Sequence, residues 1–131
     1  MRLFCYLNEI GRPYIPAFVI IPDLNARGMV DFLMDTGSDI TRLGMPDAKK
    51  LKIDYAKLPD GGIVSGVGTA SSKIVVNPIE LTFLTELNYV HQERLRGISI
   101  VLKEIPSVLG RDIMQTYRFV MEDRHHLYLE R

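Results

Sequence analysis

The most informative stretch of the sequence is Phe32-Leu33-Met34-Asp35-Thr36-Gly37-Ser38, and a second apolar run with Ile40 and Leu43 follows it. Apolar residues lead into a carboxylate and then a glycine, a pattern typical of a strand that ends at a turn. A carboxylate beside apolar strand ends is partly removed from water, and such carboxylates are candidates for acid or base chemistry. Asp35 is therefore the first candidate for a catalytic residue.

The segment 107–114, Ser-Val-Leu-Gly-Arg-Asp-Ile-Met, supports this interpretation. It has two apolar residues, a glycine, and then a stretch suited to a short helix. With both segments in place, the chain resembles the retropepsin-like aspartic proteases, the single-lobed relatives of pepsin that include the retroviral enzymes. The resemblance covers residues 14–117. It implies an all-β, closed-barrel acid protease fold with one or two short helices, and the length of the chain favours a single domain over residues 1–131.

Short strands dominate the pattern of apolar residues. Strands are expected at residues 3–7, 15–21, 29–34, 74–76, 79–84 and 98–102, with a closing hairpin formed by residues 117–121 and 127–129. Pro46 suits the first position of a helix, so we expect one short helix at residues 46–51 and another near residues 111–116.

Composition excludes several classes of partner. Sixteen basic residues balance sixteen acidic ones, so no net field favours nucleic acid or an anionic membrane. No apolar run is long enough to cross a bilayer, and no signal peptide is recognised, so a cytoplasmic location is expected. The single cysteine, Cys5, lies among apolar residues and is expected to be a small buried hydrophobe. The spacing of the three histidines does not predict a metal site.

The resemblance implies a particular catalytic arrangement. Aspartic proteases use two carboxylates that share one proton, because like charges at such close range cannot both be ionised. The chain has one Asp-Thr-Gly, and Asp23, Asp31, Asp60 and Asp112 are not followed by a Thr-Gly or Ser-Gly pair. The second carboxylate is therefore expected from the Asp35 of a second copy, in a twofold homodimer. One carboxylate would activate a water and the other would polarise the scissile carbonyl of a peptide or unfolded protein, with no metal or cofactor.

Neighbouring residues receive roles by the same resemblance. Thr36 is expected to hydrogen-bond across the dimer axis, and Gly37 to let the two catalytic loops approach. The Ser38 hydroxyl is expected to donate to a catalytic carboxylate oxygen, which favours an acidic optimum. Asp39 and Arg111 are expected to form an ion pair that ties the catalytic loop to the terminal helix.

The glycine-rich segment 61–71 is typical of a hairpin that closes over a ligand, with Gly66, Val67 and Gly68 as the substrate-binding tip of this flap. A dinucleotide-binding loop is a poor alternative for this segment. That motif needs a third glycine, which is absent here, and a helix after the loop, where the sequence predicts a strand. Five apolar residues are expected to line substrate pockets: Ile40, Val64, Val67, Ile79 and Leu109.

Simpler interpretations remain open. Asp35 as an ordinary turn residue, Asp39 and Arg111 as two solvated charges, and the flap as a loose surface loop are the alternatives. The segment 117–131 extends beyond the retroviral pattern, so the dimer interface is expected to differ, and the chain is closer to stand-alone cellular members of the family. The alternative function is a retropepsin-like module that binds peptides or mediates dimerisation without cleavage.

Overall fold

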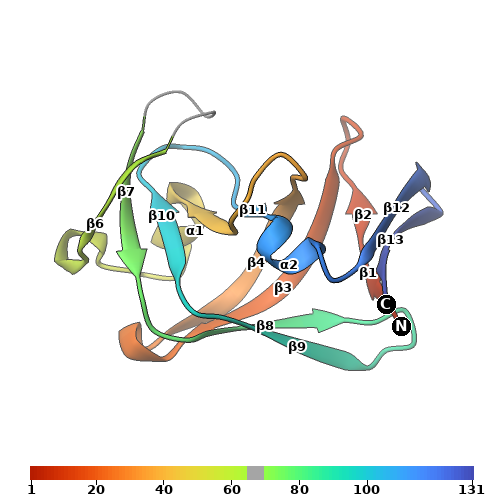
Figure 1. Ribbon diagram of the computed structural model, residues 1–131, viewed down its shortest axis with the longest axis horizontal. Coiled ribbons are helices and arrows are strands. Elements are labelled where there is room, and N and C mark those ends of the chain that lie inside the picture. Colours follow the sequence, from red (N-terminus) through yellow and green to blue (C-terminus); the bar gives the residue numbers. More distant parts are fainter. Residues whose placement is uncertain (65–69) are drawn as a thin grey trace.

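Two β-sheets account for most of the chain in the computed structural model, which describes residues 1–64 and 70–131 (Figure 1). In this part of the chain the strands are β1 (Arg2–Phe4), β2 (Tyr6–Leu7), β3 (Pro13–Ile21), β4 (Ala26–Met34), β5 (Arg42–Gly44), β6 (Asp60–Val64), β7 (Ala70–Val75), β8 (Ile79–Leu84), β9 (Val90–Leu95), β10 (Ile98–Val101), β11 (Val108–Leu109), β12 (Arg118–Asp123) and β13 (His126–Glu130). The helices are α1 (Met45–Lys50) and α2 (Arg111–Met114), with single 3₁₀ turns η1 (Pro22–Leu24) and η2 (Tyr55–Lys57). The expectation of a mainly β fold with two short helices is confirmed.

The larger sheet has the strand order β6-β7-β10-β5-β11-β4-β3-β8-β9, and β2 pairs with β3 beside this path. β3 and β4 form a long hairpin, paired from Tyr14 with Leu33 to Ile21 with Ala26. Along β3, every second residue from Ile15 to Ile21 is buried. Side chains alternate between the two faces of a strand, so one face of this hairpin packs into the core.

The two-residue strand β11 is inserted between β4 and β5. Val108 and Leu109 pair in parallel with Leu33 and Met34 of β4, and Val108 also pairs antiparallel with Arg42 of β5. These pairings place the two motifs found in the sequence side by side, although they are far apart along the chain. The segment after β11 therefore begins α2 next to the loop that follows Asp35, where the Arg111 N–H donates to the carbonyl of Ser38.

The predicted closing hairpin is present, and its partner comes from the other end of the chain. β12 and β13 pair with each other, and β1 pairs with β13 to complete a three-stranded sheet. The expected strand at residues 3–7 is wrong in one respect. The chain divides at Cys5, so that β1 joins this small sheet while β2 joins the larger one. The two termini consequently meet, and the amino group of Met1 donates to the carbonyl of Arg131 at 2.7 Å.

The C-terminal residue is also attached to β9 through a charged cluster around Glu93. The Tyr117 hydroxyl donates to Glu93 Oε1 at 2.5 Å, and the Arg131 guanidinium lies 3.5 Å from the same oxygen. Burial alone would raise the pKa of Glu93. Hydrogen bonds from Tyr117 and His91, with the charge of Arg131, outweigh burial and lower this pKa below its ordinary value of 4.5.

Sequence patterns missed β9 and found both helices. β9 reads Val-His-Gln-Glu-Arg-Leu, and only its last residue is buried. Its strand conformation comes from pairing with β8 over six residues, which no apolar pattern in β9 itself reveals. The helix expected at residues 46–51 is α1, with Pro46 in its first turn, and the helix expected near residues 111–116 is the shorter α2. Neither helix of the described ranges is long enough to span a membrane.

Candidate active site

Asp35 lies at the first position after β4, where the strand turns. Its backbone N–H donates to the carbonyl of Leu109 in β11 at 3.1 Å, which fixes the start of the turn. Its side-chain Oδ1 accepts the N–H of Gly37 at 2.9 Å, and its carbonyl accepts the N–H of Ser38 at 3.1 Å. Asp35 is half-buried, whereas Thr36 and Gly37 are exposed. The carboxylate is thus held by backbone groups at an accessible edge of the molecule.

A close backbone contact behind the turn requires glycine at position 110. A Cβ atom on Gly110 would lie 2.5 Å from the carbonyl carbon and 2.6 Å from the carbonyl oxygen of Ile40. Neither backbone atom can move away without shifting the loop that follows Asp35. The Leu-Gly-Arg pattern seen in the sequence is therefore explained, because only glycine lets β11 and α2 approach this loop so closely.

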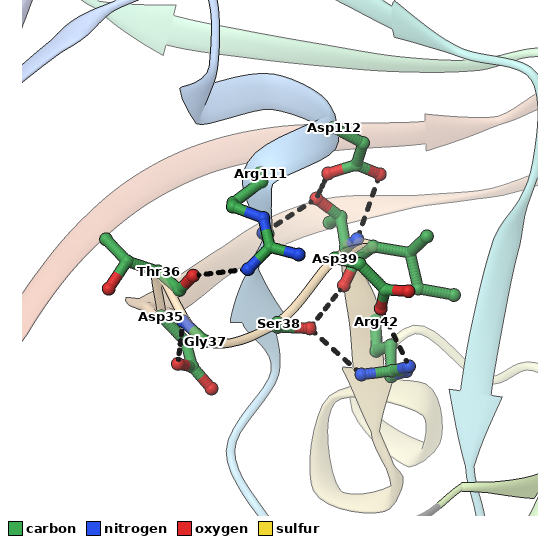
Figure 2. Close-up of polar contacts among 11 residues, drawn as sticks. Asp35, Thr36, Gly37, Ser38, Asp39, Arg42, Arg111 and Asp112 are labelled. Carbon is green, nitrogen blue, oxygen red and sulfur yellow. Dashed lines mark hydrogen bonds and ion pairs between the residues drawn. The ribbon is translucent and has the colours of Figure 1, made fainter.

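Ser38 does not make the predicted contact with a catalytic carboxylate in this chain. Its hydroxyl donates to the carbonyl of Ile40 at 2.7 Å and accepts a hydrogen bond from Arg42 Nη1 at 2.9 Å (Figure 2). The tight turn points this side chain into the loop, where it is only 6% exposed. Ser38 therefore organises the loop, and the argument for an acidic optimum loses its structural basis.

Asp39 and Arg111 take different partners from those predicted. The Asp39 carboxylate lies 3.5 Å from Arg42 Nη2 and is largely exposed, while Arg111 Nη1 donates to the carbonyl of Thr36 at 2.9 Å (Figure 2). The loop that follows Asp35 is still tied to α2, and backbone hydrogen bonds make this connection. The N–H groups of Arg111 and Asp112 donate to the carbonyls of Ser38 and Asp39 at 2.9 and 3.2 Å. The predicted side-chain ion pair is absent because both side chains have other partners: the Asp39 carboxylate lies beside Arg42, and the Arg111 guanidinium donates to the Thr36 carbonyl.

Thr41 and Asp112 form a second link between loop and helix that sequence reasoning missed. The Thr41 hydroxyl donates to Asp112 Oδ1 at 2.7 Å, and the Thr41 N–H donates to Oδ2 at 2.9 Å. The same hydroxyl accepts the N–H of Gly110 at 3.1 Å. Thr41 is 1% exposed, so these hydrogen bonds are shielded from water. The sequence signal for this link was the pair of polar residues Thr41 and Arg42 between the apolar residues Ile40 and Leu43.

The hairpin predicted to form the flap is described only in its two arms. β6 and β7 pair antiparallel up to Val64 and Ala70, which pack against Val101 and Ile105. The predicted tip residues Gly66, Val67 and Gly68 lie outside the described residues.

Two of the expected pocket walls are wrong. Ile79 and Leu109 are fully buried in the core and have no surface to offer a ligand, whereas Ile40 is 42% exposed. Alternation explains the error, because adjacent residues of a strand face opposite sides and an apolar type alone does not say which side is the core.

The cysteine is not a candidate nucleophile. Cys5 is buried as predicted, and this burial raises the pKa of its thiol to about 12. Within the described ranges, no three His, Cys, Asp or Glu side chains are grouped closely enough to hold a metal ion.

Comparisons with known proteins agree with the fold. The sequence matches no protein-family model and no curated protein. The structure is similar to that of a retropepsin-like aspartic protease from Rickettsia conorii, with a TM-score of 0.66, 21% identity, and coverage of 98% of this chain and 97% of the other. It is also similar to EIAV protease in complex with an inhibitor, with a TM-score of 0.51, 21% identity, and coverage of 83% and 90%. The chain thus has the retropepsin-like fold, as its two motifs predicted.

Proposed function

We propose that this protein is an aspartic endopeptidase that works as a homodimer. The observation that carries the proposal is the placement of Asp35. Its carboxylate stands at an accessible turn whose backbone is fixed from behind by Leu109 and by the close approach of Gly110 to Ile40. A rigid, accessible carboxylate is suited to general acid or base catalysis because it does not need to reorganise when charge develops.

A second Asp35 from a partner chain completes the proposed site. A single carboxylate can accept a proton from water but cannot at the same time donate one to the carbonyl of the substrate. Two carboxylates that share one proton provide both functions at once. Twofold symmetry is the simplest way for one chain to supply two identical groups at one place.

In the proposed reaction, the ionised Asp35 removes a proton from a water held between the two carboxylates. This water attacks the carbonyl carbon of the scissile peptide bond, while the protonated Asp35 donates to the carbonyl oxygen. The resulting tetrahedral intermediate collapses when the carboxylic acid formed from the first Asp35 gives its proton to the leaving nitrogen. The carbon–nitrogen bond breaks, the other Asp35 takes a proton from a hydroxyl of the intermediate, and the pair again holds one proton. Thr36 and Gly37 are exposed beside Asp35, as residues that meet a partner loop should be. In Figure 2 the Thr36 side chain extends away from the cluster around Ser38 and Arg42.

Cleavage of an unfolded protein such as denatured casein, assayed from about pH 3 to about pH 8, tests the proposal. The wild type is compared with Asp35→Asn and with Asp54→Asn, a matched control at an exposed aspartate that pairs only with Lys57 in the described structure. Each protein is assayed at two concentrations with its oligomeric state measured in parallel.

Activity that rises faster than protein concentration, persists in Asp54→Asn and disappears in Asp35→Asn supports the dimeric protease. A wild-type sample that is dimeric and cleaves nothing at any pH would contradict it and favour a peptide-binding or dimerisation module.

A further inference from the structure

The sheet around Asp35 has one buried and one open face. Register places Leu33 of β4 beside Val108 of β11, and Val108 beside Arg42 of β5. Paired residues point to the same face of a sheet, so these three side chains form one row. All three are half-buried, whereas the next residue of each strand is buried, namely Met34, Leu109 and Leu43. Leu33, Val108 and Arg42 therefore line the open face.

The Asp35 carboxylate belongs to this open face. Asp35 is two positions after Leu33, and side chains two positions apart along a strand point the same way. In Figure 2 the carboxylate of Asp35 and the guanidinium of Arg42 extend to the same side of the loop, with Ser38 between them. A peptide positioned for attack beside Asp35 would thus lie over two apolar side chains and one cation.

Among the described residues, Arg42 has few hydrogen-bond partners. The guanidinium carries five N–H donors. Within the described structure its hydrogen bond goes from Nη1 to Ser38 Oγ, and its buried Nε has no hydrogen-bond partner. The nearest carboxylate, on Asp39, stands 3.5 Å from Nη2 with its side chain 71% exposed, while the Arg42 side chain is 20% exposed. An ion pair with so exposed a partner contributes little, so a largely buried cation is left with a weak counter-charge.

We infer that Arg42 makes this open face select substrates with a glutamate or aspartate side chain close to the scissile bond. The inference rests on the proposed protease function and names the class of substrate for that site. A carboxylate over the exposed edge of the guanidinium would accept charge-assisted hydrogen bonds from it and supply the counter-charge that Asp39 provides poorly. Leu33 and Val108 would contact the apolar parts of the same peptide.

The test uses fluorogenic peptides in pairs that differ only by glutamate or its neutral isostere glutamine, one position at a time on both sides of the cleaved bond. Assays run at about pH 5.5, where a free glutamate is ionised. The readout is the ratio of kcat/KM for the two members of a pair, which is internal to each variant. The variants are Arg42→Gln, Asp39→Asn and, as the matched control, Arg94→Gln at an exposed arginine paired with Glu80.

We expect the wild type to prefer glutamate by about 10-fold at one position, the effect of one hydrogen bond to a charged group. Arg94→Gln should keep this ratio and Arg42→Gln should reduce it to about one. Asp39→Asn should increase it, because Arg42 then loses its competing counter-charge, and added salt should decrease it in the wild type.

A wild type that cleaves both members of every pair equally would overturn the inference and leave the protease function standing. Glutamate preference that survives in Arg42→Gln would also overturn it. If Arg42→Gln does not fold, the wild-type ratio, its salt dependence and the Asp39→Asn ratio still decide the question. A dimeric wild type that cleaves no peptide would overturn the protease function and, with it, the inference.

Discussion

Replacing Thr41 with valine should strongly destabilise the fold, although the two side chains have nearly the same shape. The substitution removes the hydroxyl that donates to Asp112 Oδ1 at 2.7 Å and accepts the N–H of Gly110 at 3.1 Å. A hydrogen bond to a charged group contributes about 1.5–3 kcal/mol, and a buried N–H left without an acceptor costs about 1–3 kcal/mol. Because Thr41 is 1% exposed, water cannot replace the hydroxyl. The expected loss is about 3 kcal/mol in the free energy of unfolding.

Thr41→Ser is the matched control because it keeps the hydroxyl and removes only a methyl group. It should lose about 1 kcal/mol, the typical cost of one buried methyl. Urea denaturation measures both variants at one fixed protein concentration, because the proposed dimerisation would add to the apparent stability. In thermal unfolding, Thr41→Val should lower Tm by about 10 °C in a domain of this length.

A double-mutant cycle with Asp112→Ala isolates the pair. If the hydroxyl acts mainly through Asp112, the cost of Thr41→Val should be smaller in the Asp112→Ala background than in the wild type. Equal destabilisation by Thr41→Val and Thr41→Ser, or strict additivity with Asp112→Ala, would refute the reasoning.

Three further predictions follow from other contacts. Gly110→Ala should lower Tm and the proposed peptidase activity together, because its Cβ would lie 2.5 and 2.6 Å from backbone atoms of Ile40. An unchanged Tm and unchanged activity would contradict the close approach. Glu93 has a lowered pKa when folded, so its carboxylate stabilises the protein above about pH 4.5 and this contribution disappears as pH falls through the folded-state pKa. The Glu93→Gln variant should therefore be less stable at neutral pH, and its Tm should fall less on acidification than that of the wild type. If the Tm of both proteins changes with pH in the same way, the contacts of Glu93 do not cause the pH dependence. Cys5 should react with a thiol reagent in urea but not in buffer, since it is buried and its pKa is raised to about 12.

Much of the fold could be predicted from the sequence because its signals are local. Asp35-Thr36-Gly37 and the segment 107–114 identified the two loops, Pro46 marked α1, and a run rich in apolar and β-branched residues marked β3. The errors arose where an element depends on its neighbours. β9 has a polar sequence and is a strand because it pairs with β8. The opening strand divides at Cys5 because residues 2–4 pair with β13 and residues 6–7 pair with β3.

The sequence by itself determined the two loops of the candidate site: a carboxylate on a glycine turn, and a second glycine loop, expected to lie beside it. Only the tertiary structure decided which side chain contacts which. It assigned Ser38 to the loop interior, gave Asp39 to Arg42, joined Thr41 to Asp112, and placed Arg42 on the open face with Asp35. The physical reason is that a turn depends on the residue types at neighbouring positions in the chain. Hydrogen-bond partners instead depend on strand register and on which face of the sheet is covered.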